Sequence, residues 1–327
     1  MADAVVMRDN MQNYAGLLFR KGNAAVPFSS LIGTPETTNH NEFSCGTYFD
    51  TEDGEQPEIS EKASLTAPDA KSTGRTQTTN VTQIFQEKVS ISYAKMSDMG
   101  TLSGINVANA VANPSDERAF QIARRMDKIA KDIEYSFVRG TYQKATSSDV
   151  AAKTMGIMEA IKTNVIDVGT AETPAALTYW TLAKALVALR DAGADVSKAV
   201  FIGSAAAILQ LNKDAVENQY RQDTITEMGL NLQRVVTPLG TIKVALVDTL
   251  NAKKAETYNN GAIVIPELIH PVYQPVPGKG NFFYEELAKT GAAESGQIFG
   301  QVGLDFGPEY YYAKLQYISN DLPTGTL

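Results

Sequence analysis

The chain has 327 residues and a mass of 35.3 kDa, and 43% of its residues are hydrophobic, so it can bury a large core and is longer than one compact domain requires. Its 29 basic and 37 acidic side chains give a net charge of −8, which opposes a function as a general clamp for DNA or RNA, because phosphate binding requires clustered lysine and arginine. The single cysteine, Cys45, excludes an internal disulfide and a cysteine-built zinc site.

The N-terminal 33 residues are expected to form an arm with apolar anchors. Leu17, Leu18 and Phe19 precede Arg20, and a second apolar group follows. The first ten residues carry an acid where a signal peptide has bases, and no apolar run in the chain approaches the roughly 20 residues that span a bilayer. Neither secretion nor membrane insertion is therefore expected.

An acidic stretch, residues 36–62, follows the arm and contains Lys62 as its one basic residue. Four of its acids stand close together: Glu52, Asp53, Glu55 and Glu58. Such a stretch cannot collapse on itself. Polar and apolar residues then roughly alternate over residues 76–96, which predicts a strand. We expect a long two-stranded loop that leans on a partner, since a lone hairpin is marginally stable in water.

A long amphipathic helix is predicted next. Asn113-Pro114-Ser115-Asp116 is a strong helix start, and apolar residues then recur every three or four positions until Gly140. At about 1.5 Å per residue, some 26 residues make a rod of roughly 40 Å. We expect Met126, Ile129 and Ile133 to be buried under a sheet. The opposite, polar face carries four cations: Arg124, Arg125, Lys128 and Lys131.

The middle of the chain is predicted to be α/β. A helix from about Thr178 carries a leucine stripe and stops at Gly193, and the apolar run 199–202 predicts a buried strand that leads into a short helix ending near Leu211. Pro238-Leu239-Gly240 lies between two apolar segments and predicts a hairpin.

The tail after Gly261 is predicted to be mostly strand. Ile298, Val302, Leu304 and Phe306 keep an even spacing, which is typical of one buried face of a strand. The tyrosines at 310–312 could stack on bases, but few cations surround them, so packing in a sheet or an interface is the favoured interpretation.

No catalytic, cofactor-binding or metal-binding residues are assigned. His40 and His270 are the only histidines, and no Gly-x-Ser-x-Gly elbow accompanies them. The run from Asp50 resembles a calcium loop, but its glycine falls at the fifth position instead of the sixth; a solvated or partner-facing acidic surface is favoured over another kind of cation site. The Gly203-Ser204 turn lacks the P-loop lysine and is taken as a packing turn. An enzyme is not expected.

Five short segments in a characteristic order carry a resemblance to a known family. They are Asn80-Val81-Thr82-Gln83-Ile84-Phe85, Asp132-Ile133-Glu134-Tyr135, Met155-Gly156-Ile157, Thr237-Pro238-Leu239-Gly240-Thr241 and Leu287-Ala288-Lys289-Thr290-Gly291. In this order the chain resembles the major capsid proteins of tailed phages with the Hong Kong 97-like fold, in the branch called the major head protein family of short-tailed phages. The resemblance covers about residues 28–318.

The resemblance implies an α+β capsid fold with an N-terminal arm, an extended E-loop hairpin, a long spine helix in a peripheral (P) domain and an α/β axial (A) domain. The implied division is 1–33 for the N-terminal arm, 34–95 for the E-loop, 96–149 for the P domain with the spine helix, 150–270 for the A domain, and 271–327 for returning P-domain strands. Because an E-loop of this fold lies over a neighbouring P domain, the resemblance also implies subunit interfaces. Their candidate residues are Glu52, Asp53, Glu55 and Glu58 in the E-loop, Arg124, Arg125, Lys128 and Lys131 on the helix, and Leu17, Leu18, Phe19 and Arg20 in the arm.

The implied function is that of a structural subunit of an icosahedral or prolate phage head, which self-assembles into hexamers and pentamers and encloses double-stranded DNA without binding it specifically. An encapsulin-like nanocompartment shell protein is the alternative, and an enzyme of unrecognised α/β type is a third. The implied partners are other copies of the chain, a separate scaffolding protein, a portal, and a decoration or cement protein, with no membrane. The implied location is the virion, after assembly in the host cytoplasm.

Overall fold

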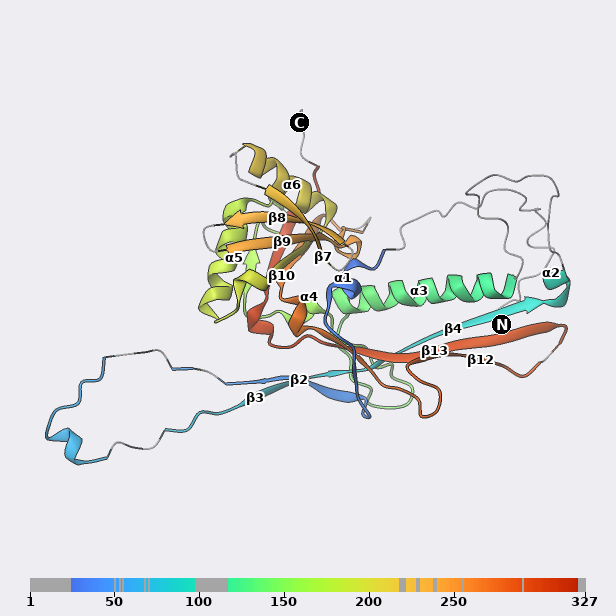
Figure 1. Ribbon diagram of the computed structural model, residues 1–327, viewed down its shortest axis with the longest axis horizontal. Coiled ribbons are helices and arrows are strands. Elements are labelled where there is room, and N and C mark those ends of the chain that lie inside the picture. The colour runs from blue at the N-terminus through green and yellow to red at the C-terminus, as the bar shows by residue number, and fades with distance from the viewer. Residues whose placement is uncertain are drawn as a thin grey trace.

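The computed structural model is an elongated molecule (Figure 1). A two-stranded arm of β2 (Glu42–Tyr48) and β3 (Thr76–Val81) projects at one end, and the long helix α3 (Glu117–Arg139) runs beside the long strands β4 (Gln83–Ser92) and β13 (Ala293–Asp305) toward the other. The described residues are 25–49, 51–52, 54, 56–67, 69, 71–97, 117–217, 222–227, 230–237, 240–253, 256–289 and 291–322.

A five-stranded sheet with β13 at its centre lies under α3. β13 pairs antiparallel with β4, with β12 (Phe282–Glu286) and with β11 (His270–Tyr273), and the two-residue β1 (Glu36–Thr37) extends the sheet beside β11. The evenly spaced apolar residues of β13 are all buried, as their alternation predicted: Ile298, Val302, Leu304 and the following Phe306. Short helices α1 (Pro27–Leu31) and α2 (Tyr93–Ser97) pack against α3.

A seven-stranded sheet forms the second layered unit. Its strand order is β5 (Val165–Asp167), β14 (Ala313–Ser319), β10 (Tyr258–Val264), β6 (Val200–Gly203), β9 (Gly240–Leu246), β8 (Leu230–Thr237) and β7 (Gln222–Glu227). β8 and β9 form the predicted hairpin, and β6 runs parallel to β9. Helix α4 (Ile157–Ala160) packs against α3 and joins the core between the two units.

Both faces of the seven-stranded sheet are covered. Phe201 belongs to a core shared with α5 (Tyr179–Asp191) and α6 (Ala205–Glu217), whereas the neighbouring Val200 and Ile202 belong to the core shared with α3. A strand buried on both faces reads as a continuous apolar run, which explains residues 199–202.

The predicted limits of α5 agree with the structure. Thr178 is its N-cap and accepts a hydrogen bond from the backbone of Thr181, and Gly193 adopts a φ of 85° just after its end, where a side chain would be strained. The helix after β6 does not end near Leu211; it continues to Glu217.

The structure corrects two further expectations. Ile129 is 3% exposed and Ile133 packs against the core, but Met126 is 42% exposed, and the buried residues of α3 all lie from position 129 onward. The tail 271–327 does not stay in one sheet: β14 lies between β5 and β10 of the seven-stranded sheet, where Leu315 and Ile318 are fully buried.

Candidate assembly surfaces

The projecting arm exposes large apolar side chains. Phe49 is 63% exposed, Ile59 66% and Leu65 85%, and all three lie beyond the paired part of β2 and β3. Exposed aromatic and aliphatic residues on an extension are typical of surfaces that a partner covers.

One acid of the arm, Glu52, pairs with a lysine from the other side of the loop, Lys71. Glu52 Oε2 lies 3.3 Å from Nζ of Lys71, across the loop, and both side chains are more than two-thirds exposed. Glu58 is exposed, while Asp53 and Glu55 lie outside the described residues. Glu52 is therefore paired within its own chain by a lysine that lies outside the acidic stretch 36–62.

Three of the four predicted cations on α3 already have a carboxylate partner in their own chain. Lys128 Nζ lies 2.7 Å from Oε1 of Glu87 on β4 and 2.6 Å from Oδ2 of Asp132, and these carboxylates raise the pKa of Lys128, Asp132 more than Glu87. Arg125 lies 3.6 Å from the same Glu87. Ion pairs this exposed are each worth about 0 to 1 kcal/mol.

The remaining pairs on this face differ. Arg124 pairs with Asp127 one helical turn along, at 3.1 Å. Lys131 forms no ion pair with any residue the structure describes. Sequence reasoning missed Glu87, because it lies on a strand that only the fold brings beside the helix.

A buried carboxylate anchors the segment that leads in from the N-terminus. Glu134 on α3 is 1% exposed; its Oε1 accepts a hydrogen bond from Phe28 N and its Oε2 one from Ser29 N, both at 2.8 Å. Burial raises the pKa of Glu134, although the hydrogen bonds from Ser29 and Phe28 oppose that shift. The predicted arm residues, Leu17, Leu18, Phe19 and Arg20, lie outside the described residues.

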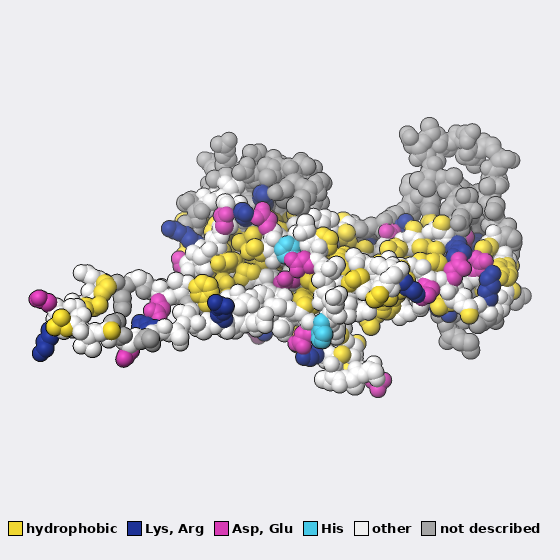
Figure 2. Space-filling view, turned by 60° about the horizontal axis from the view of Figure 1, so that its bottom comes forward, with side chains coloured by type: hydrophobic (Ala, Val, Ile, Leu, Met, Phe, Trp, Pro, Cys, Tyr) yellow, Lys and Arg dark blue, Asp and Glu magenta, His cyan; other side chains and the backbone are white. Residues whose placement is uncertain are grey.

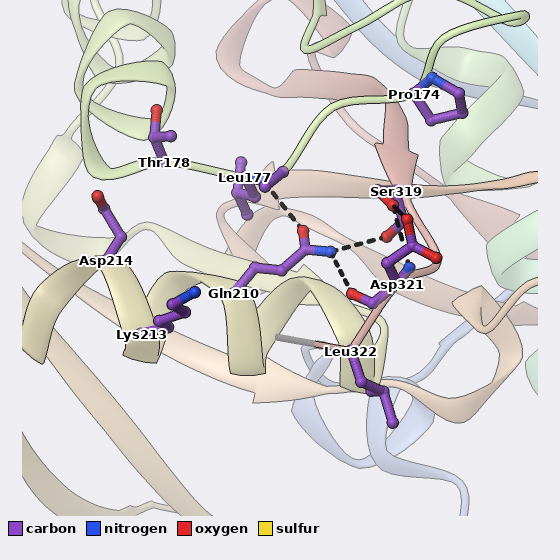
Figure 3. A pocket seen from close by; sticks show the side chains of 10 residues that line it. Pro174, Leu177, Thr178, Gln210, Lys213, Asp214, Ser319, Asp321 and Leu322 are labelled. Carbon is purple, nitrogen blue, oxygen red and sulfur yellow. Dashed lines mark hydrogen bonds between the residues drawn. The ribbon is translucent and has the colours of Figure 1, made fainter. Parts of the chain in front are cut away.

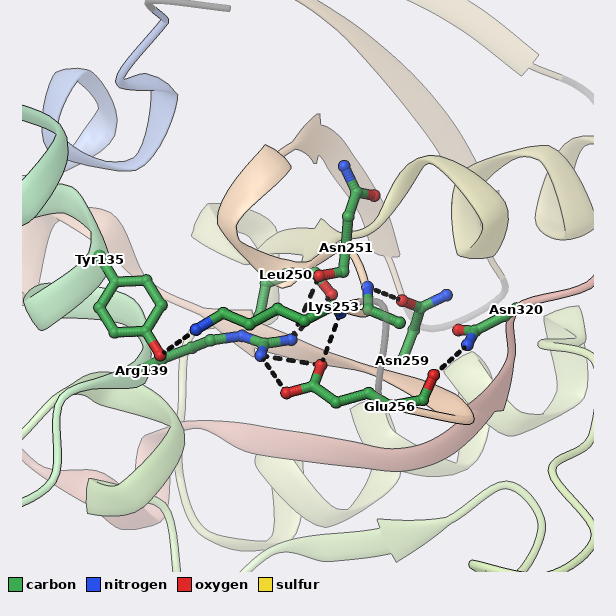
Figure 4. Close-up of polar contacts among 9 residues, drawn as sticks. Tyr135, Arg139, Leu250, Asn251, Lys253, Glu256, Asn259 and Asn320 are labelled. Carbon is green, nitrogen blue, oxygen red and sulfur yellow. Dashed lines mark hydrogen bonds and ion pairs between the residues drawn. The ribbon is translucent and has the colours of Figure 1, made fainter.

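The last turn of α3 is tied to the loop that precedes β10 (Figure 4). Arg139 Nη1 donates to both carboxylate oxygens of Glu256, at 2.8 and 2.9 Å, and lowers the pKa of Glu256. Lys253 Nζ lies 2.8 Å from the hydroxyl of Tyr135, and the backbone carbonyl of Glu256 accepts from Asn320. These contacts join the five-stranded and seven-stranded units.

A cavity of about 430 Å³ lies beside α6 and the end of β14 (Figure 3). The amide of Gln210 spans it: Oε1 accepts from Leu177 N at 3.0 Å, and Nε2 donates to the carbonyls of Ser319 and Asp321. Gln210 therefore holds the end of β14 against α6. Both ends of its amide are hydrogen-bonded to the described backbone, so the amide does not mark a ligand site.

The described surface offers little reactive chemistry. Nowhere in the described ranges do three or more His, Cys, Asp and Glu side chains gather as metal ligands. His270 Nδ1 lies 3.0 Å from the carbonyl of Thr34. On the face drawn in Figure 2, basic and acidic side chains are interspersed along the arm and the long sheet. None of the described helices is long and apolar enough to cross a membrane.

Comparisons with known proteins agree on the fold. The sequence model of a family described as SU10 major capsid protein matches residues 4–319. Among solved structures, the SrpI encapsulin complex of Synechococcus elongatus PCC 7942 is similar with a TM-score of 0.64 and 11% identity over all of both chains. The capsid of cyanophage P-SCSP1u gives a TM-score of 0.56 at 11% identity, covering 95% of this chain and 93% of the other. The capsid of a native GTA particle gives 0.57 at 12% identity, covering 93% of each. No curated protein matches the chain.

Proposed function

Because the chain belongs to the SU10 major capsid protein family and has the Hong Kong 97-like capsid fold, we propose that this structural capsid subunit builds the hexamers and pentamers of an icosahedral or prolate phage head around double-stranded DNA. The family match over residues 4–319 carries this proposal. The chain acts in the virion, and the proposed site of assembly is the host cytoplasm. A separate scaffolding protein, a portal and a decoration protein are its proposed partners.

The proposed domains follow the fold with one revision. The arm and β4, within residues 34–95, form the E-loop and its root; α3 and the strands β11, β12 and β13 belong to the P domain. The seven-stranded sheet forms the A domain, and it includes β14 in addition to its six strands within residues 150–269. The tail therefore crosses from the P domain back to the A domain.

The proposed contact between subunits uses the arm. Phe49, Ile59 and Leu65 serve as apolar anchors on a neighbouring P domain, and the acids around Glu52 and Glu58 form a charged rim. Among the four α3 cations, Lys131 is the one that no described carboxylate pairs. Arg124, Arg125 and Lys128 would have to give up the carboxylate of their own chain in order to bind an acid of a neighbouring arm. The rim should therefore tune assembly less than the anchors do.

Assembly of the purified chain tests the proposal. We expect closed shells by electron microscopy when the chain is expressed with its scaffolding protein. A strictly monomeric species in light scattering at high concentration, with the scaffold present, contradicts the proposal.

Variants of the arm separate its two parts. Leu65→Ser should abolish assembly without changing the subunit's melting temperature, because Leu65 touches little of its own chain. Changing Glu52, Asp53, Glu55 and Glu58 to amides should alter only the salt dependence of assembly. Unchanged assembly of Leu65→Ser shows that the arm is not anchored in this way.

An encapsulin-like compartment is the second candidate, and the likeness to the SrpI encapsulin favours it. Neighbouring genes distinguish the two: portal and terminase genes accompany a phage head, and a cargo enzyme gene accompanies a compartment.

A further inference from the structure

The base of the arm is buried against β13. We call this contact the socket; it is formed by Cys45 and Asn80 of the arm and by Gly303 and Leu304 of β13. Cys45 is fully buried, with Sγ 3.7 Å from the carbonyl of Leu304, and it is the extra residue of a β-bulge between Ser44 and Gly46. Bulges bend a strand and raise its local twist. The direction of the arm relative to the two sheets is therefore set by the residues around the bulge at Cys45.

Asn80, opposite Phe43 in the arm's ladder, is the polar centre of this socket. Its side chain is fully buried. Nδ2 donates to the carbonyl of Leu304 at 2.7 Å and lies within hydrogen-bond distance of Oγ1 of Thr154 and the carbonyl of Met155, at 3.1 and 3.2 Å. Oδ1 accepts from Met155 N at 2.8 Å. One amide thus joins the arm, the segment after α3 and β13.

The apolar side of the socket has no spare room. A Cβ added at Gly303 would lie 2.7 Å from the ring of Phe43 and 2.8 Å from the carbonyl oxygen of Val81, the last residue of β3. Because Val81 O is a backbone atom, rotating one side chain cannot make room for a Cβ at position 303, and the backbones of the arm and β13 must move relative to each other. Gly303 is thus required by the close approach of the arm to β13.

We infer that Asn80 and Gly303 are positioning residues that hold the arm at one fixed angle to the body, and that this angle determines whether neighbouring subunits close into a shell of one size. The part about the shell rests on the proposed function; the part about the angle concerns the isolated subunit. A buried polar group with all its partners is an expected device for such a joint, since any other arm angle would leave Asn80 and its backbone partners unpaired.

The first measurement is made on the unassembled subunit. Spin labels on Thr47→Cys in the paired part of the arm and Lys184→Cys on α5 report the distance between the arm and α5 by pulsed electron resonance, since both sites are exposed. Burial raises the pKa of the Cys45 thiol, which keeps it from reacting with the label. We expect one narrow distance distribution in the parent, and a shifted or broadened one in Asn80→Ala and Gly303→Ala.

Two control variants test whether a loss of subunit stability alone changes the measured distance. Gly300→Ala also introduces a clash in β13, 2.3 Å from the ring of Phe282, but on the side of β12. Asn259→Ala removes another buried asparagine, whose Oδ1 accepts from Ala252 N in the other unit. Both controls should lower the melting temperature and leave the distance distribution unchanged. Distributions that are unchanged in Asn80→Ala and Gly303→Ala, or equally broadened in the controls, overturn the inference.

The second measurement is the diameter of the assembled particles by electron microscopy. Gly303→Ala should yield open or mixed-size particles and several-fold fewer closed shells, whereas Gly300→Ala should assemble as the parent does. Parent-like shells from Gly303→Ala overturn the link to shell closure. Failure of the parent itself to assemble counts against the proposed function. The distance measurement on the unassembled subunit still tests whether Asn80 and Gly303 fix the angle of the arm.

Discussion

The burial of Ile129 predicts a specific loss of stability in Ile129→Ala. The side chain is 3% exposed and belongs to the core that α3 shares with both sheets. Truncation removes three carbon atoms, worth about 0.8 kcal/mol each in transfer from water, and leaves a cavity besides. We expect a loss of about 3 kcal/mol in the free energy of unfolding.

Met126→Ala is the matched control on the same helix. Met126 lies one turn before Ile129 and is 42% exposed, so its truncation should cost under about 1 kcal/mol. Urea unfolding of the unassembled subunit, followed by circular dichroism, measures both. With an m-value of about 3 kcal/mol/M, the Ile129 variant should unfold at a urea concentration about 1 M lower.

Equal midpoints for the two variants would refute the conclusion that α3 buries Ile129 and exposes Met126. A larger shift for Met126→Ala than for Ile129→Ala would mean that the helix turns its other side to the sheet. Ile129→Asp should be worse than Ile129→Ala, because it buries an unpaired charge.

The exposure of Trp180 and the contacts of Glu256 and Glu134 can each be tested separately. Trp180 is the only tryptophan and is 73% exposed, so acrylamide should quench the fluorescence of the unassembled subunit efficiently; strong protection there would contradict its placement. The pKa of Glu256 is lowered by Arg139, so the stability that Glu256→Gln loses should be present at neutral pH and disappear as the pH falls through that lowered pKa; a pH-independent difference would show that the pair is not ionic. Glu134→Ala should speed hydrogen exchange in residues 25–33 while leaving β13 protected, and unchanged exchange there would rule out the anchor.

Local patterns in the sequence determined most of the elements. The three-to-four spacing of apolar residues places α3, the even spacing from Ile298 places β13, and Thr178 and Gly193 mark the ends of α5. Each of these signals depends on backbone geometry within one or two turns, where side chains a few positions apart either share a face or do not. The order of the segments was enough to indicate the capsid fold.

Only the tertiary structure decided which distant residues meet. Glu134 and Phe28 are 106 positions apart, and nothing near either residue shows that a helix carboxylate will anchor that segment. The pairing of Lys128 with Glu87, the exposure of Met126 and the place of β14 in the seven-stranded sheet are of the same kind. A periodic pattern shows that one side of an element is apolar, but how much of that side is covered, and by which strand, depends on how the two sheets and the long helix pack together.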